Sequence, residues 1–321
     1  MKQSCEISSD IAHAATILKG GGLVAFATET VYGLGANALE AEAVAKIFEA
    51  KQRPHFDPLI VHIAEINWLE DLVTFVPEKA RALMDHFWPG PLTVVLPKTD
   101  RVPDLVTSGL PSVAVRMPSH EQARDLIASA GVPIAAPSAN RFGQLSPTEA
   151  RHVQQQLGDR VDLILDGGPC RVGVESTVVR ATDDSCQILR HGGVAQEEIE
   201  AIVGNVELAD VSERPEAVAS PGMLPQHYSP RTRLVILNDD ITLPAKGLRV
   251  GELCFQEPTG HIASVKIERL SKDGNLREAA ANLFAALWRL DTSDINLIVA
   301  HQFPNEGLGR AINDRLSRAA D

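Results

Sequence analysis

Two cationic side chains stand two residues apart at the end of a predicted helix, in the segment Lys51-Gln52-Arg53-Pro54. A guanidinium offers a planar fork of donors and an ammonium a mobile point charge, and together they suit a chain of phosphates. Pro54 forces a turn, which can direct both side chains into a cleft. The residues alone favour an ordinary helix end, because cations complement the negative end of the helix dipole.

A second polar segment, Pro137-Ser138-Ala139-Asn140, directly follows an apolar run. Ligand contacts in α/β folds lie at the carboxyl ends of strands, and neutral hydroxyl and amide donors suit phosphate or ribose oxygens. Serine, asparagine and proline are also ordinary turn residues. The segment on its own therefore also fits a plain turn.

Two arginines, Arg116 and Arg190, each end an apolar run. A partly buried arginine requires a carboxylate or phosphate partner. Each therefore indicates either a ligand site or a structural ion pair.

Hydroxyls and a carboxylate gather at another predicted strand end, in Thr28-Glu29-Thr30-Val31-Tyr32-Gly33. Glu29 fits a helix cap, a base or a solvated turn. His62 lies inside an apolar run, where a hydrogen-bonded core residue is more typical than a ligand. Glu175, Ser176 and Thr177 begin a strand and carry little information by themselves.

The elements that must position these residues alternate between strands and helices. Apolar runs predict strands and a 3.6-residue period predicts helices. In the first 200 residues, the predicted strands are 23–27, 59–63, 92–96, 113–116, 132–136, 161–165, 176–180 and 187–190. The predicted helices are 38–50, 120–130, one from about Pro77, and one that starts with a capping box of Ser146 and Glu149. The pattern predicts a mixed α/β domain around a central sheet, in an order that the sequence does not reveal.

Residues 204–233 carry four prolines and little periodicity, so they predict a long interdomain linker. After it, strands at 234–237, 248–253 and 295–300 alternate with helices at 276–290 and 308–319. This alternation predicts a small α/β domain with a parallel sheet. We therefore expect domains at 8–200 and 234–321, joined by 204–233.

The bulk composition is that of a soluble globular protein, with 321 residues, 44% hydrophobic and 22% charged. The formal net charge is -12, and Lys and Arg form no cluster. Strong, nonspecific nucleic-acid binding is therefore not expected.

The four cysteines, Cys5, Cys170, Cys186 and Cys254, have no C-x-x-C spacing, and no zinc pattern is complete. The start of the chain lacks a signal-peptide pattern, and no apolar run reaches the length of a membrane span. We expect free thiols and a cytoplasmic location without membrane contact. Neither a Walker A loop nor a G-x-G-x-x-G turn is present.

Taken together, these segments indicate a protein family far more specifically than each segment does alone. TETVYGLG, KQRP, DPLIVHI, SVAVRMP, APSANRFGQLSPT, ESTVV and ILRHGG occur in this order within residues 8–195. This resembles the YrdC-type threonylcarbamoyl-AMP synthase family. SPGMLPQHYSP and GLGRAINDRLSRAA make the chain similar to the long, two-domain form.

The resemblance implies an open, twisted, YrdC-like α/β catalytic domain with a large concave cavity. It also implies a smaller, Rossmann-like C-terminal α/β domain and a linker over the active site that could act as a lid. The implied reaction joins L-threonine, bicarbonate and ATP into threonylcarbamoyl-AMP and pyrophosphate. A downstream tRNA-modifying transferase complex would use this adenylate to modify the adenosine next to the anticodon. Magnesium would be carried by ATP, and the protein would hold no metal of its own.

The resemblance also implies the site residues. The threonine contacts would be Thr30, His62, Arg116, Ala136 and Ser176, with Arg116 and Ser176 on the carboxylate. The ATP contacts would be Arg53, Asp57, Ser112, Ser138, Ser146, Arg190 and Tyr228. The catalytic set would be Lys51 and Arg53, which neutralise the triphosphate, and Ser138 and Asn140 on the opposite wall.

Three positions depart from the family pattern. Asp57 stands where asparagine is usual, and a carboxylate there would repel phosphate unless it faces ribose, adenine or a metal. Ser112 replaces a common threonine and keeps the hydroxyl. Leu224-Pro225-Gln226 replaces basic residues, so linker contacts to phosphate would be weaker.

Two other functions fit parts of the pattern. One is a nonenzymatic RNA-binding or ribosome-associated YrdC-type protein, which the charge of -12 disfavours. The other is carbamoyl transfer in hydrogenase maturation, for which the chain lacks both the length and the cysteines of zinc-finger-like segments.

Overall fold

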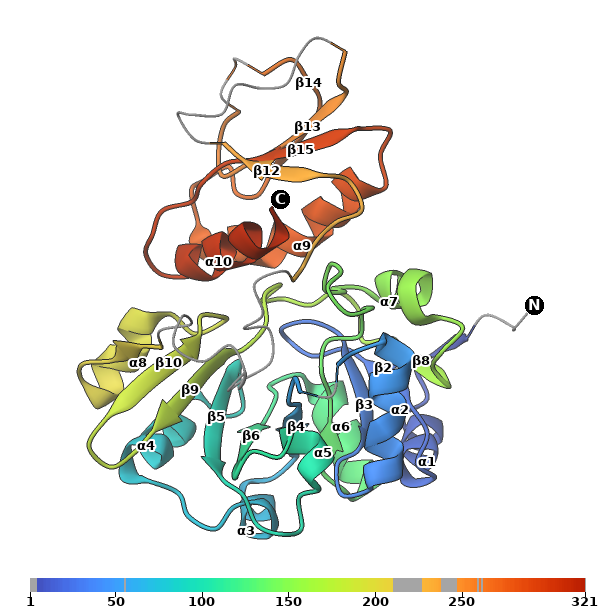
Figure 1. The fold of residues 1–321 in the computed structure, drawn as a ribbon, viewed down its shortest axis with the longest axis vertical. Helices are drawn as coiled ribbons and strands as arrows, with labels where there is room; N and C mark the ends of the chain where they lie inside the picture. The colour runs from blue at the N-terminus through green and yellow to red at the C-terminus, as the bar shows by residue number, and fades with distance from the viewer. Residues whose placement is uncertain are drawn as a thin grey trace.

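The computed structural model describes residues 5–54, 56–209, 227–237, 247–258, 260 and 262–320. These residues form two α/β units, one above the other in Figure 1. Helices α9 and α10 of the second unit lie between its sheet and the first unit. The fold predicted from the sequence, a larger α/β domain followed by a smaller one, is confirmed.

The first unit is built on an 11-stranded mixed sheet in the order β1-β8-β2-β3-β7-β4-β6-β5-β9-β10-β11. Its strands are β1 (Glu6–Ser8), β2 (Val24–Phe26), β3 (Gly33–Asn37), β4 (Ile60–His62), β5 (Leu92–Pro97), β6 (Ser112–Arg116), β7 (Ile134–Ala135), β8 (Leu163–Leu165), β9 (Thr177–Ala181), β10 (Cys186–Arg190) and β11 (Glu207–Leu208).

The helices of the first unit pack on this sheet in two apolar clusters. They are α1 (Ile11–Lys19), α2 (Ala41–Lys51), α3 (Leu69–Leu72), α4 (Glu78–Phe87), α5 (Asp104–Thr107), α6 (Glu121–Ala130), α7 (Ala150–Leu157) and α8 (Gln196–Val203), with a short 3-10 turn, η1 (Ile66–Trp68). The predicted strands are all present, within a few residues. Strands β1, β3 and β11 were not predicted.

The register of the central strands sets where the polar residues lie around β4. Strands β4 and β6 run parallel, with His62 opposite Arg116. Strand β7 runs antiparallel to β4 with Ile134 opposite His62, so the loop after β7 begins beside Ile60, at the other end of β4. A further bridge joins Gly33, the first residue of β3, to Ser138 in that loop. Segments that are far apart in the sequence are therefore brought next to β4, with Arg116 beside its end and the loop of Ser138 leaving from its start.

The second unit has a four-stranded sheet in the order β12-β15-β13-β14. Every pairing in it is parallel, as predicted. Its elements are β12 (Leu234–Ile236), β13 (Val250–Cys254), β14 (Ser264–Arg269), α9 (Leu276–Asp291), β15 (Leu297–Ala300) and α10 (Gly309–Ala319). Strand β14, which alternates half-buried and exposed residues, was not predicted.

The two units share one apolar cluster. Val31, Leu145 and Val174 of the first unit pack with residues of α9 and α10, and Tyr228 joins them. The backbones also approach closely, because a Cβ on Gly173 would lie 2.4 Å from the carbonyl oxygen of Ala280 in α9. The interface is therefore packed like a protein core.

Most of the predicted linker, including Leu224-Pro225-Gln226, lies outside the described residues. Its first part extends the sheet of the first unit, because β11 pairs with β10. All four cysteines are free thiols. Within the described ranges, no helix has the length and apolar character needed to span a bilayer.

Candidate active site

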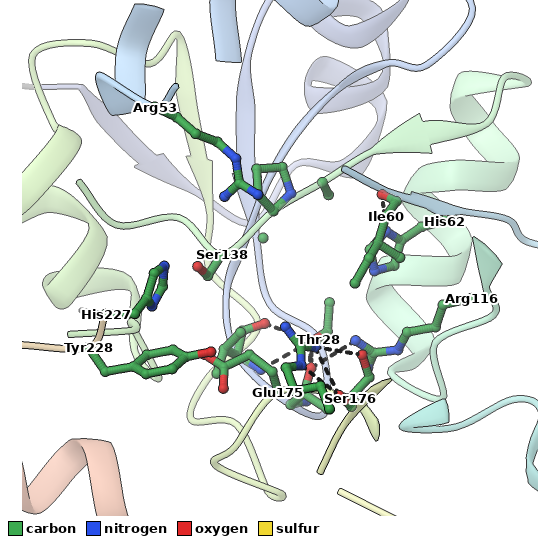
Figure 2. Close-up of a pocket in the computed structure, with 16 residues that line it drawn as sticks. Thr28, Arg53, Ile60, His62, Arg116, Ser138, Glu175, Ser176, His227 and Tyr228 are labelled. Carbon is green, nitrogen blue, oxygen red and sulfur yellow. Dashed lines mark hydrogen bonds between the residues drawn. The ribbon is translucent and has the colours of Figure 1, made fainter. Parts of the chain in front are cut away.

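A cavity opens where β4, β6 and the loop after β7 meet (Figure 2). It has about 500 Å³ of empty space, with the solvent at its mouth included. Its lining comes from both predicted residue sets and from the segment that leads to the second unit. The lining residues are Thr28, Thr30, Val31, Gly33, Arg53, Ile60, His62, Arg116, Ala136, Pro137, Ser138, Glu175, Ser176, Arg190, His227 and Tyr228.

Arg116 forms the polar centre of one wall. Its guanidinium makes a 2.7 Å ion pair with Glu29, and both side chains are buried. It also donates to the Thr30 hydroxyl at 2.9 Å and to the Gly90 carbonyl oxygen at 3.2 Å. Burial opposes ionisation of Glu29, but Arg116 outweighs it and holds the pKa of Glu29 below its ordinary value. Arg116 is thus both a structural ion pair and a cavity residue, and the interpretation of Glu29 as a solvated turn is wrong.

His62 stands beside Arg116 and is 3% exposed. Burial, followed by the charge of Arg116, lowers the pKa of His62 to about 3. Its Nδ1 lies 3.3 Å from the carbonyl oxygen of Ile60. His62 is therefore a neutral imidazole near pH 7, buried as expected and also part of the cavity wall.

Ser176 completes this wall. Its hydroxyl lies 2.7 Å from that of Thr93, and its carbonyl oxygen accepts a 2.9 Å bond from Arg190. All five residues of the predicted threonine set line the cavity: Thr30, His62, Arg116, Ala136 and Ser176.

On the phosphate side, Arg53 lines the cavity and pairs with Asp57 at 2.8 Å. It also donates to the Pro58 carbonyl oxygen at 3.0 Å. Burial raises the pKa of Asp57, more than the neighbouring cations lower it. Asp57 does not line the cavity and faces the guanidinium, which removes the conflict expected between its carboxylate and a phosphate.

The side chain of Lys51 binds different partners from that of Arg53. It is 1% exposed, and its ammonium donates to the carbonyl oxygens of Ser138 at 2.5 Å and Asn140 at 2.6 Å. Asn140 is fully buried and its amide donates to the carbonyl oxygens of Arg141 and Gln144, both at 2.8 Å. The expectation that both cations point into one cleft therefore holds for Arg53 alone, and Lys51 shapes the loop that presents Ser138.

Ser112 and Ser146 do not line the cavity. Ser112 starts β6, at the far end of the strand from Arg116, and lines a separate groove with Phe75 and Pro97. The capping box predicted for Ser146 is wrong, because α7 starts at Ala150 and the Ser146 hydroxyl donates instead to Glu175 at 2.5 Å. Arg190 and Tyr228, the other two predicted ATP contacts, both line the cavity.

The second unit reaches this site through residues that sequence reasoning missed. Arg315 of α10 pairs with Glu175 at 2.8 Å, and Trp288 of α9 donates to the Ser146 carbonyl oxygen at 3.2 Å. Glu175 lies in ESTVV and Arg315 in GLGRAINDRLSRAA, so the motifs contained both residues without revealing that they meet. No group of three or more metal-ligating side chains gathers in the part of the chain that the structure describes.

Two family models together match almost the whole chain. The Sua5–YciO–YrdC model, described as "Telomere recombination", matches residues 16–192. The model of the threonylcarbamoyl-AMP synthase C-terminal domain matches residues 194–321.

Named relatives agree with these models. The threonylcarbamoyl-AMP synthase of Bacillus subtilis is 46% identical, over 97% of this chain and 92% of its own length. A putative threonylcarbamoyl-AMP synthase of Mycobacterium tuberculosis is 36% identical. The alignment spans 61% of this chain and 90% of that protein. The crystal structure of Pyrococcus abyssi Sua5 complexed with L-threonine superposes with a TM-score of 0.89 at 41% identity, over 97% of this chain and 94% of that one.

Proposed function

Because the chain belongs to the Sua5–YciO–YrdC family of threonylcarbamoyl-AMP synthases, in its two-domain form, we propose that it joins L-threonine, bicarbonate and ATP into threonylcarbamoyl-AMP and pyrophosphate. The adenylate would be passed to a tRNA-modifying transferase complex in the cytoplasm. One observation carries the proposal: Arg53 and Arg116, from distant segments, line the same cavity together with Ser138 and Ser176.

The threonine end of the cavity is the wall of Arg116. Its guanidinium already holds the Thr30 hydroxyl and the Glu29 carboxylate, and a substrate carboxylate would add to this set from the cavity side. Ser176 offers a hydroxyl to the same carboxylate. The neutral imidazole of His62 can hydrogen-bond the substrate without adding charge. The complex of P. abyssi Sua5 with L-threonine supports threonine as the substrate.

The triphosphate end is the wall of Arg53 and Ser138. Asp57 pairs with Arg53 at 2.8 Å and holds its guanidinium in place. Lys51 and Asn140 would act indirectly, because their hydrogen bond helps to hold the loop that carries Ser138. Tyr228 and Arg190 line the cavity, whereas Ser146 would act through Glu175. Ser112 stays a prediction from the sequence.

The chemistry needs positioning and charge neutralisation rather than a covalent enzyme intermediate. The threonine amine adds carbon dioxide, supplied by bicarbonate, to give a carbamate. One carbamate oxygen attacks the α-phosphorus of ATP, the bond to the β-phosphate oxygen breaks, and pyrophosphate leaves. Carbamates are labile in water, so the cover of His227 and Tyr228 would protect the intermediate. Magnesium would enter on the triphosphate, where it lowers the charge of the leaving pyrophosphate.

The test is release of pyrophosphate from ATP by the full chain, measured with both co-substrates and with each one omitted. We expect release that depends on L-threonine and bicarbonate together. Release that ignores threonine, or none under any condition, would contradict the proposal. RNA binding that weakens with salt, without pyrophosphate release, would favour the nonenzymatic alternative. The domain limits 8–200, 204–233 and 234–321 remain part of the proposal.

A further inference from the structure

Arg315 is the largest fully buried side chain among the described residues, and it belongs to the second unit. It extends from α10 across the interface toward the first unit. Its Nε donates to Glu175 at 2.8 Å and its Nη1 donates to the carbonyl oxygen of His191 at 2.9 Å. A second carboxylate, of the adjacent Asp314, accepts from the same Nη1 at 2.6 Å. A buried guanidinium is costly to desolvate, so this set of partners calls for an explanation.

Arg315 contacts two residues that line the cavity, Glu175 and Tyr228. Glu175 lines the cavity and also accepts the Ser146 hydroxyl. The Arg315 guanidinium carbon lies 5.1 Å from the centroid of the Tyr228 ring, a cation–π distance. In Figure 2, Tyr228 points its hydroxyl into the cavity toward the side where Glu175 lies. One arginine therefore contacts two lining side chains from behind.

The contact is held in a fixed position by its surroundings. Gly173 has a φ of +74°, and the backbone of α9 packs against it too closely to admit a side chain. Val174, which follows, is fully buried in the apolar cluster that joins the two units. On the other side, Trp288 donates to the carbonyl oxygen of Ser146. The segments that carry Glu175 and Ser146 are thus both anchored to the second unit.

The charge of Glu175 is what Arg315 controls. Burial opposes ionisation of this carboxyl, but Arg315 and then Arg190 outweigh it and hold the pKa of Glu175 below its ordinary value. Glu175 is therefore an anion on the wall of a cavity proposed to receive a polyanion. Without a counter-charge, it would repel the phosphates across a medium of low polarity.

We propose that Arg315 is a positioning residue that the second domain supplies to the nucleotide wall, where it neutralises Glu175 and supports the ring of Tyr228. The inference rests on the proposed function, since it assigns the charge balance of that same site. It explains why a second domain is attached: its α10 completes the electrostatics of a cavity formed by the first domain.

The central test is a double-mutant cycle on the full chain. Arg315→Met keeps much of the side-chain volume and removes the charge, and it should raise KM for ATP at least about tenfold, because Glu175 stays buried but loses its ion-pair partner. KM for L-threonine should change less than about threefold, since the partners of Arg116 lie in the first unit. Adding Glu175→Gln to Arg315→Met removes this anion and should recover most of the ATP affinity.

Two further variants separate this role from simple attachment of the domains. Arg310→Met removes another arginine of α10 that crosses the same interface, where it pairs with Glu197 at 2.5 Å, away from the cavity. It should leave both KM values near wild type. Arg315→Lys keeps the charge but not the fork to Glu175 and His191, so its KM for ATP should fall between wild type and Arg315→Met.

The outcomes are distinguishable. An unchanged KM for ATP in Arg315→Met, or a double variant no better than the single one, would overturn the inference. Equal losses for ATP and threonine, shared by Arg310→Met, would reduce Arg315 to a structural contact and also overturn it. If Arg315→Met is insoluble, Arg315→Lys and the double variant still decide the question. Loss of threonine-dependent pyrophosphate release in the wild type would instead contradict the proposed function.

Discussion

The two walls of the cavity are stabilised in different ways. On one side, Arg116, Thr30 and His62 are held by the register of β4 and β6 and by Glu29, all inside the first unit. On the other side, Glu175 and Tyr228 take their support from Arg315 of the second unit. Figure 2 shows His62 and Arg116 facing His227 and Tyr228 across the cavity. The comparison teaches that one wall of the cavity is fixed within the first unit, while the other wall depends on the contact between the two units.

The largest effect is expected at Arg53, the cation of the nucleotide wall. Arg53→Gln removes the guanidinium and should lower pyrophosphate release by about a hundredfold or more, since a buried charge aimed at the reacting group is lost. Circular dichroism should show an intact fold. Turnover at the wild-type rate would remove Arg53 from the phosphate role.

Arg116 is the matching test on the other wall. Arg116→Gln leaves Glu29 without its counter-ion and removes the fork for the substrate carboxylate. We expect kcat/KM for L-threonine to fall by about a hundredfold, with the Kd for a nonhydrolysable ATP analogue changed by less than about threefold. Steady-state kinetics gives kcat/KM for L-threonine, and titration calorimetry gives the Kd of each ligand. Equal loss of both affinities would break the distinction between the walls.

Acid should weaken both walls together. Burial lowers the pKa of His62 and of His227 to about 3, below the ordinary value of 6.5. Below pH 6.5 the unfolded chain therefore binds protons that the folded chain does not, and stability falls as the pH drops toward 4. Each histidine contributes a slope of at most about 1.4 kcal/mol per pH unit.

Chemical denaturation between pH 7 and pH 4 measures this slope. His62→Asn on one wall and His227→Asn on the other should each make the slope of stability against pH shallower. A slope that neither substitution changes would assign the acid sensitivity to other groups.

The smallest effect is expected at Trp288, whose indole stacks on His152 with centroids 4.5 Å apart. Trp288→Phe removes the hydrogen bond to Ser146 and should cost about 1 kcal/mol of stability. KM for ATP should rise about twofold and KM for threonine should stay constant. A larger shift for threonine than for ATP would contradict the dependence of the nucleotide wall on the second unit.

The sequence predicted the elements well where periodicity and apolar runs are strong, as in α6, β5 and α9. It left the strand order open, and this order is what brings His62 opposite Arg116. The resemblance supplied the residues of the threonine set, and the structure places all five at one cavity.

The sequence failed where a distant partner competes with a local one. Ser146 has the spacing of a helix cap, but Glu175 offers a buried carboxylate and captures the hydroxyl. Lys51 has the position of a helix-end cation, yet its ammonium crosses to the 138–140 loop. Local patterns cannot reveal such partners, because they are brought together only by tertiary packing.

The order of strands in the second unit bears on when the enzyme can first work during its own synthesis. Strand β15 lies between β12 and β13, although it follows β13 and β14 in the chain. Residue 300 must therefore be synthesised before all four strands of that sheet can pair, and Arg315 is added after it. All 11 strands of the first unit precede them. In a growing chain, the strands that carry Arg116 and His62 are therefore made well before Arg315, the ion-pair partner of Glu175.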